Sequence, residues 1–160
     1  MALNVALSGG RRTVLHVAVE QKDMKMLQHG LEKGLDVNLA GGMYGETPLM
    51  YATYKNKGWP EGVRYLIEQG ADVNATKGMA RTPLMIAAEF NRVEIAEDLI
   101  AAGADATVKY IDGRTAAGWA KQYGHLELEA KFDQVIAKQL EHKRSHPDVP
   151  GGSHAQGMLQ

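Results

Sequence analysis

Three histidines near the C-terminal end of the chain are the residues that could most readily bind a metal ion. They are His142, His146 and His154, in a segment that also holds prolines and glycines. Imidazole nitrogen is a common ligand of transition metals. The three residues are loosely spaced, however, and the neighbouring Lys143 and Arg144 would repel a cation. We therefore expect a solvated segment, and a metal-binding or small-ligand-binding protein is the third of three functional hypotheses.

Nucleophilic and acid–base catalysis find little support among the other residues. The chain has no cysteine, and its three serines, Ser8, Ser145 and Ser153, all lie close to its ends. Acyl transfer therefore lacks its usual nucleophiles. The sequence contains no glycine-rich phosphate loop and no His-Glu-x-x-His helix. Aspartates recur in Gly-x-Asp units, but turn chemistry explains an aspartate there. We predict that the protein is not an enzyme and needs no cofactor.

These aspartates belong to a block of residues that occurs four times. Thr-Pro-Leu-Met-Tyr-Ala at 47–52 returns as Thr-Pro-Leu-Met-Ile-Ala at 82–87, and fainter copies begin at Thr13 and Thr115. The four threonines are 34, 35 and 33 residues apart. The first three copies lead into a Gly-x-Asp unit, which ends at Asp36, Asp72 or Asp105. Self-similarity at this period predicts a stacked array of repeats.

Each copy carries the signals of two helices. Threonine is a good N-cap and proline suits the first helical position, so Thr47-Pro48 and Thr82-Pro83 each predict the start of a first helix. Apolar residues at helical spacing follow and predict a second helix, which ends at the glycine of the Gly-x-Asp unit. The alanines of the first helix would let adjacent repeats approach closely.

This repeat resembles the ankyrin repeat, whose signature is a Thr-Pro-Leu-His turn followed by two helices. The resemblance runs from about Arg11 to about Leu140 and implies an all-α solenoid of helix-turn-helix units with projecting β-hairpin-like loops. Only the first copy keeps the histidine, His16, so we expect a reduced polar network between neighbouring turns. We divide the chain into an N-terminal segment (1–10), an ankyrin repeat domain (11–142, with repeats at about 11–43, 44–78, 79–111 and 112–142) and a disordered tail (143–160).

The second copy is two residues longer than its neighbours, and the extra residues fall within 56–60. Pro60 can restart the second helix, which leaves Trp59 just before it. One interpretation is that Trp59 folds back on its own helix as a hydrophobic staple. The alternative is an exposed accessory anchor for a partner.

The last copy continues into a helix that we expect to end near Glu141 and to cap the core. Its apolar positions are Leu126, Leu128, Phe132, Val135, Ile136 and Leu140. Their spacing is that of an amphipathic helix, and a terminal repeat must cover the open end of the array.

The family resemblance also implies a concave binding surface, made by the loop tips and the outward positions of the first helices. Loop tips are normally polar, but here each carries a large apolar residue. Tyr54, Phe90 and Tyr123 recur at equivalent places and would align as a stripe across successive repeats. The predicted contact residues are Met43, Tyr44, Tyr54, Lys55, Met79, Arg81, Phe90, Tyr110, Ile111 and Tyr123.

A single array with one such face favours a protein that binds and occludes one folded protein partner. We predict an inhibitor or regulator, with an enzyme as one possible target, as in immunity or self-protection. The alternative is an adaptor that bridges two proteins. The net charge of −1 gives no overall case for nucleic acid or a membrane surface. We expect a monomer in the cytoplasm by default, or an exported protein if a leader was removed.

Overall fold

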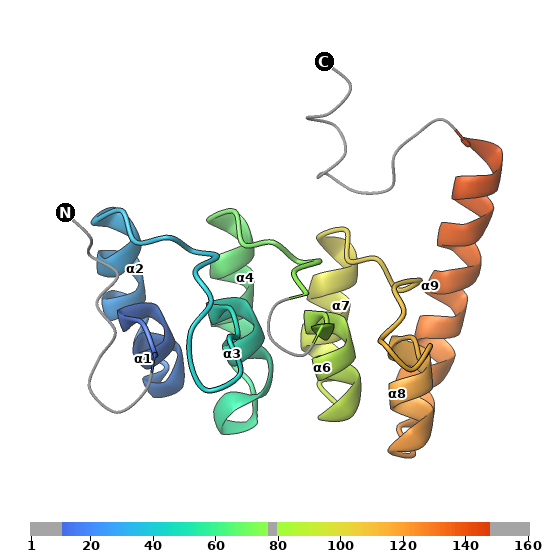
Figure 1. Cartoon of the computed structure of the whole chain (residues 1–160), viewed down its shortest axis with the longest axis horizontal. Coiled ribbons are helices and arrows are strands. Elements are labelled where there is room, and N and C mark those ends of the chain that lie inside the picture. The colour runs from blue at the N-terminus through green and yellow to red at the C-terminus, as the bar shows by residue number, and fades with distance from the viewer. Residues whose placement is uncertain (1–10, 77–79, 148–160) are drawn as a thin grey trace.

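The computed structural model describes residues 11–76 and 80–147, which form a row of helix pairs. The first helices of the pairs are α1 (Val14–Gln21), α3 (Pro48–Tyr54), α6 (Pro83–Glu89) and α8 (Ala116–Gln122). The second helices are α2 (Met24–Glu32), α4 (Pro60–Glu68), α7 (Val93–Ala101) and α9 (Leu126–Ser145), and the short 3₁₀ turn η1 (Lys55–Lys57) follows α3. The pairs follow one another along the array and long loops join them (Figure 1). The predicted all-α repeat solenoid is confirmed.

All four first helices begin at the predicted threonines. The hydroxyl oxygens of Thr13, Thr47, Thr82 and Thr115 each accept a hydrogen bond from the backbone N–H three residues later, at 3.3–3.4 Å. Proline occupies the first turn of α3 and of α6. The repeated Thr-Pro thus acts as a helix start, because a cap satisfies one of the donors that a helix N-terminus leaves unpaired.

The insertion in the second copy forms a tight turn between α3 and α4. Asn56, Lys57 and Gly58 all have positive φ, and α4 begins at Pro60 as predicted. Trp59 is 7% exposed, and a side chain added at Gly62 would collide with its ring. Trp59 therefore packs on the first turn of its own helix. The alternative role as an exposed anchor is wrong, since a partner could not reach the ring.

The three Gly-x-Asp units share one turn geometry. Gly34, Gly70 and Gly103 have φ between 87° and 96°, which glycine adopts at low cost. At the second unit the N–H of Gly70 bonds to the carbonyl of Ile67, and the N–H of Ala71 bonds to the carbonyl of Leu66. This is the Schellman arrangement that ends a helix.

The aspartate carboxylate of each unit accepts a hydrogen bond from the backbone N–H two residues later, at 2.9 Å. The three aspartates, Asp36, Asp72 and Asp105, therefore serve the turn, as their position predicted.

Side-chain amides join each of these turns to the next. The Asn38 carbonyl accepts from the N–H of Asp72 at 2.8 Å, and its amide donates to the carbonyl of Gly70 at 3.3 Å. Asn74 makes the same two bonds to Asp105 and Gly103, at 2.7 and 3.3 Å. Each asparagine therefore satisfies one donor and one acceptor in the following repeat.

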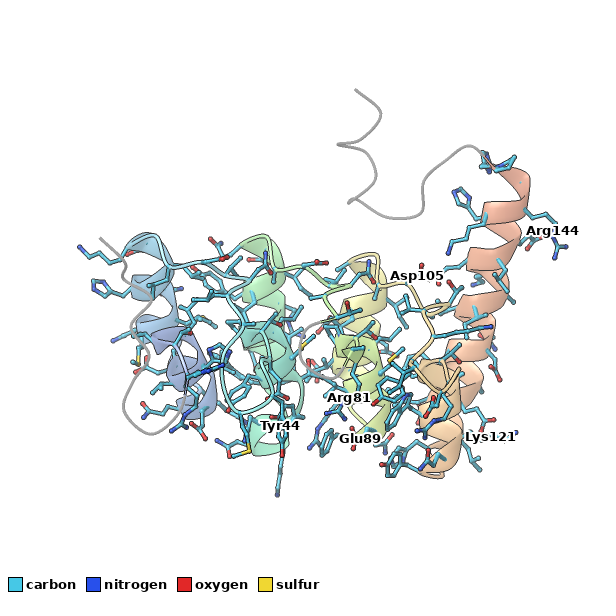
Figure 2. The ribbon with its side chains drawn as sticks, viewed as in Figure 1. Tyr44, Arg81, Glu89, Asp105, Lys121 and Arg144 are labelled. Atoms are coloured by element: carbon cyan, nitrogen blue, oxygen red, sulfur yellow. The ribbon has the colours of Figure 1, made fainter. Side chains whose placement is uncertain are left out.

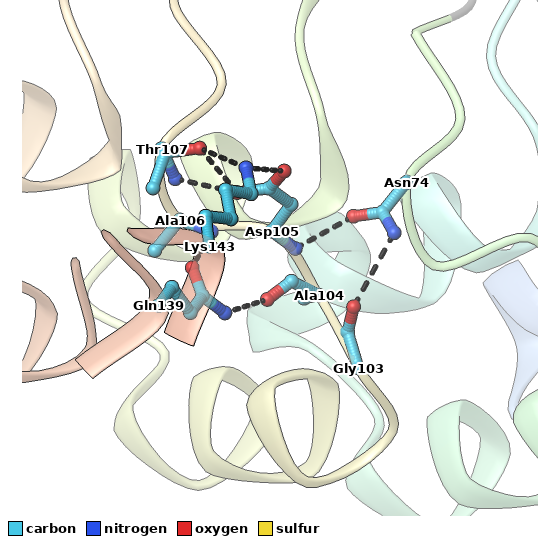
Figure 3. A network of polar contacts seen from close by, with 8 residues as sticks. All are labelled: Asn74, Gly103, Ala104, Asp105, Ala106, Thr107, Gln139 and Lys143. Atoms are coloured by element: carbon cyan, nitrogen blue, oxygen red, sulfur yellow. Dashed lines mark hydrogen bonds and ion pairs between the residues drawn. The ribbon is translucent and has the colours of Figure 1, made fainter. Parts of the chain in front are cut away.

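The last step of this ladder is made by a residue of α9. Gln139 accepts from the N–H of Ala106 and donates to the carbonyl of Ala104, both at 2.9 Å (Figure 3). Lys143 also contacts Asp105 and Thr107, both at 3.1 Å. The terminal helix thus closes the ladder, which explains why it is longer than the second helices before it.

Helix α9 covers the end of the core as expected, but two of its six predicted apolar residues are exposed to solvent. Leu128 and Phe132 are fully buried, whereas Leu126 is 72% and Leu140 is 48% exposed. The helix also runs to Ser145, three residues past the boundary predicted at 142. No helix in the described ranges is long and apolar enough to cross a membrane.

The core is a continuous layer between the two rows of helices. Neighbouring first helices are in contact, α1 with α3, α3 with α6 and α6 with α8. Ala18, Ala52, Ala87 and Ala120 on these helices are each 0% exposed. Alanine has no side chain beyond Cβ, so adjacent helices can approach closely, and the bulkier leucines fill the space behind them.

His16 uses both ring nitrogens, one within its own repeat and one to link the first two repeats. Nδ1 accepts from the N–H of Thr13 at 3.2 Å, and Nε2 lies 2.7 Å from the carbonyl oxygen of Glu46. Nε2 is therefore the protonated nitrogen of a neutral ring, and burial lowers the pKa of His16 below 6.5. Met50 and Met85 fill the equivalent positions as buried apolar residues, so this histidine bridge is made in one place.

We expect His16 to make stability depend on pH. In the unfolded chain the ring takes up a proton below about 6.5, whereas in the folded chain it stays neutral to a lower pH. The unfolded state then binds more protons, so the free energy of unfolding falls as pH falls below about 6.5. Urea unfolding between pH 5 and 8 tests this. His16→Met should cost about 1–2 kcal/mol at pH 8 and less at pH 5. A difference that does not change with pH would contradict this account.

We also expect Gln139→Ala to destabilise the array by about 2 kcal/mol, because it leaves the N–H of Ala106 and the carbonyl of Ala104 without partners. Lys138→Ala is the matched control, since Lys138 is exposed on the same helix. Urea unfolding of both variants measures the difference. Equal stabilities would show that water replaces the amide at no cost.

Candidate protein-binding face

The predicted contact residues gather on one side of the array, which we call the loop-tip face. We define it as residues 11–12, loop residues 41–46, 81 and 109–114, and the ends of the first helices at 20–21, 54–55, 89–90 and 121–123. Figure 2 shows Tyr44, Arg81, Glu89 and Lys121 along one edge of the array, with Asp105 and Arg144 toward the opposite edge.

Exposure separates the predicted residues into two groups. Met43 is 86%, Tyr44 53%, Phe90 40%, Ile111 81% and Tyr123 45% exposed. A second group is only half-buried and packs within the chain: Tyr54, Lys55, Arg81 and Tyr110. Met79 lies outside the described residues. The first group exposes apolar surface to solvent, while the second group packs against other residues of the chain.

An open hollow of about 800 Å³ occupies the N-terminal part of the loop-tip face. The first loop tip, which includes Met43 and Tyr44, forms one wall, and Tyr51, Tyr54 and Lys55 of the second repeat form the other. The loop is closed by an antiparallel bridge between Gly41 and Glu46. The hollow is thus shaped by a hairpin-like loop set against the end of α3.

Tyr54 is held in the wall of this hollow by two contacts. Its hydroxyl donates to the Glu46 carboxylate at 3.1 Å, and its ring stacks on Phe90 of the next repeat with centroids 5.3 Å apart. Burial raises the pKa of Glu46, and burial together with the nearby Glu46 charge raises the pKa of Tyr54. The Lys55 ammonium lies over the rings of Tyr51 and Tyr54 at 5.1 and 5.3 Å. Tyr54 is therefore an integral part of the wall.

A second aromatic cluster lies at the C-terminal part of the face. Trp119 is buried, meets Tyr110 edge-on at 5.5 Å and stacks with Tyr123 at 6.2 Å. The Arg114 guanidinium lies 4.2 Å from the Trp119 ring centre, within the range of a cation–π interaction. Tyr123 also stacks with His125 at 6.3 Å.

The predicted stripe of Tyr54, Phe90 and Tyr123 is therefore interrupted. Tyr54 and Phe90 stack across two repeats, but Tyr123 pairs with Trp119 and His125 of its own repeat. The three places are also not equivalent, since Tyr54 lies seven residues after its capping threonine, whereas Phe90 and Tyr123 lie eight residues after theirs. Trp119, which the fourth copy carries in place of the earlier Tyr51 and Ile86, provides the stacking surface for Tyr123.

Sequence reasoning missed a row of residues just before the capping threonines. Arg12 pairs with Glu20 and Arg81 pairs with Glu89, each over eight residues. Glu46 and Tyr54 hold the same two positions in the second repeat. The eight-residue spacing recurs in register with the threonines, so the sequence did contain this signal.

Among the residues that the structure describes, those considered for metal binding do not form a site. The His142 and His146 rings stack with centroids 4.7 Å apart near the end of α9. Within the described ranges, no three histidine, aspartate or glutamate residues are grouped so that they could hold a metal ion. His154 lies outside those ranges.

We expect Tyr54→Ala to lower the free energy of unfolding by about 2–4 kcal/mol, because it removes ring packing and the bond to Glu46. Tyr54→Phe keeps the stack and should lose about 1 kcal/mol. Tyr44→Ala, at an exposed tyrosine, should stay within about 0.5 kcal/mol. Urea unfolding compares the three variants. If Tyr54→Ala were as stable as Tyr44→Ala, Tyr54 would be a surface residue only.

Comparisons with known proteins agree with this architecture. Residues 3–77 match a family model described as ankyrin repeats in three copies, and residues 56–100 match one described as ankyrin repeats in many copies. The Danio rerio protein named "Putative palmitoyltransferase ZDHHC13" is 36% identical over 109 residues, which are 68% of this chain and 17% of that protein.

Two other proteins are similar to this chain over part of their length. The E3 ubiquitin-protein ligase Ufd4 of Drosophila melanogaster is 37% identical over 116 residues, which are 70% of this chain and 4% of the ligase. The "Putative ankyrin repeat protein" of Rickettsia bellii is 46% identical over 57 residues, 36% of this chain and 34% of that protein. The chain thus spans only a minor part of each relative. Its capped helix pairs, its glycine turns and these matches show that the chain belongs to the ankyrin repeat family.

Proposed function

We propose that the chain is an inhibitor or regulator that binds one folded protein through the loop-tip face and occludes that partner's active site or docking surface. Ankyrin repeats form a protein–protein interaction module. The loop-tip face is one broad surface of the described residues. Binding there and covering the partner's functional surface is therefore the simplest way for the chain to act. An enzyme is a suitable target, as in immunity or self-protection, and the chain itself needs no catalytic group.

The distribution of exposed apolar side chains carries this proposal. Seven large apolar side chains in the described ranges are exposed, and five of them lie on the loop-tip face. These five are Met43, Tyr44, Phe90, Ile111 and Tyr123. A solvated loop gains nothing from such residues, whereas aromatic and methionine side chains are enriched at protein interfaces. The supporting aromatic stacks hold the surface in one conformation, which reduces the entropy lost on binding.

One observation favours the adaptor as a second candidate. Leu140 is 48% exposed on α9, away from the loop-tip face, and could contact another protein. Removing residues 145–160 and, separately, replacing Leu140 with alanine would distinguish the two functions. An inhibitor keeps its full effect on the first partner in both variants, whereas an adaptor loses the second partner.

We expect the triple variant Met43→Ala, Tyr44→Ala, Ile111→Ala to lose partner binding while keeping the fold. Each side chain is more than half exposed, so the free energy of unfolding should change by less than about 1 kcal/mol in total. Loss of about 1 kcal/mol of binding free energy at each position corresponds to a roughly 100-fold weaker Kd. Capture of the partner from an extract of the source cells, followed by calorimetry with the purified partner, measures this change.

The control is Leu140→Ala, which removes an exposed leucine from the opposite side. It should leave the Kd of the first partner unchanged. Equal capture by wild type and triple variant would show that the partner binds elsewhere, and an undisturbed partner activity in the complex would rule out occlusion.

A further inference from the structure

We infer that the protein bound by the loop-tip face presents an acidic surface, with carboxylate side chains around a central apolar contact. This inference rests on the proposed function and adds the chemistry of the partner. It is carried by the charges of the face and by how each of them is already used within the chain.

The loop-tip face is cationic although the chain as a whole is not. By sequence it holds seven cationic and four acidic side chains. The cationic ones are Arg11, Arg12, Lys55, Arg81, Lys109, Arg114 and Lys121. The rest of the chain then holds eleven cationic and fifteen acidic residues, since the totals are 18 and 19. The excess positive charge of the face is therefore balanced by negative charge elsewhere, and an approaching acidic protein is steered toward this face.

The four carboxylates of the face are each engaged inside the chain. Glu20 pairs with Arg12 and Glu89 pairs with Arg81. Hydrogen bonds from Arg114 hold Asp112 and lower the pKa of its carboxyl group. Glu46 is 5% exposed and accepts from Tyr54. A partner that relied on basic side chains would have to compete for these groups.

Two cations of the face are instead placed beside exposed aromatic surface. The Lys55 ammonium lies over the rings of Tyr51 and Tyr54 and forms no ion pair with a described residue, and Tyr54 in turn stacks on the exposed Phe90. Lys121 is exposed in the last turn of α8, close in sequence to the exposed Tyr123. A carboxylate could therefore reach either ammonium while the neighbouring part of the partner covers the ring.

The same arrangement favours a protein over a nucleic acid. Phosphate backbones bind to a continuous basic groove. Here Glu20, Glu89 and Asp112 are paired with three of the cations. The most exposed of the large apolar side chains are Met43 and Ile111. A surface that combines exposed apolar side chains with charged ones is typical of a protein interface, which has an apolar centre and a polar rim.

The test is selection of a displayed library of random 16-residue peptides on the immobilised full chain. We expect the selected peptides to be rich in aspartate, glutamate and aromatic residues. One selected peptide is labelled and its binding is measured by fluorescence anisotropy. It should bind about tenfold more weakly to the double variant Lys55→Glu, Lys121→Glu than to the wild type. It should bind with less than a twofold change to Lys25→Glu, Lys138→Glu, which makes the same change in net charge on second helices. Raising the salt from 50 to 300 mM should weaken binding.

Several results would overturn the inference. Neutral or basic selected peptides that lose affinity for the Met43, Tyr44, Ile111 triple alanine variant would refute the acidic partner and leave the proposed function standing. Peptides that are insensitive to that triple variant, or a selection without binders, would count against the proposed function itself. A 30-nucleotide poly(U) strand that binds more tightly than the selected peptide, with the same sensitivity to Lys55→Glu, Lys121→Glu, would replace the protein partner with a nucleic acid.

Discussion

An amide side chain can donate and accept at the same time, and in this chain three of them each bridge two backbone groups of a neighbouring turn. Asn38 and Asn74 fix the distance and angle between successive repeats, and Gln139 fixes the last one. The buried alanines are close-packed only at that spacing, and the ring of Tyr54 reaches Phe90 only because α3 and α6 are held side by side. The loop-tip face therefore depends on polar bonds at the opposite edge of the array.

Local signals in the sequence predicted most of the fold. Threonine caps, the prolines after them and the glycines at helix ends act within a few residues, so Thr47 or Gly70 can be interpreted without knowing its distant neighbours. The burial of Trp59 and the exposure of Leu126 depend on what lies across the turn or on the next helix. For Trp59 the deciding neighbour is Gly62, because the absence of a Cβ there makes room for the indole ring.

The candidate site was predictable in position but less so in detail. The exposed Met43, Tyr44, Phe90, Ile111 and Tyr123 were all named from the sequence, because equivalent places in a repeat have equivalent exposure. Tyr54 holds the same place as Glu20 and Glu89, yet it is drawn into the wall by Glu46, the residue that replaces an arginine in this one repeat. The repeat pattern predicts the average environment of a position. The environment in one particular copy also depends on which residue that copy carries at the contacting position.

The arginine and glutamate pairs help to hold the face in one shape. A pair such as Arg81 and Glu89 joins the entry and the exit of one first helix, so the loop tip and the helix end are held together. The pair uses the glutamate and leaves the outer face of the guanidinium open to a neighbouring ring, as the 6.0 Å separation between Arg81 and Trp119 shows. Where the second repeat exchanges this pair for Glu46 and Tyr54, the carboxylate is buried and the cation nearby is Lys55. In both arrangements the carboxylate is engaged by a side chain of the same repeat.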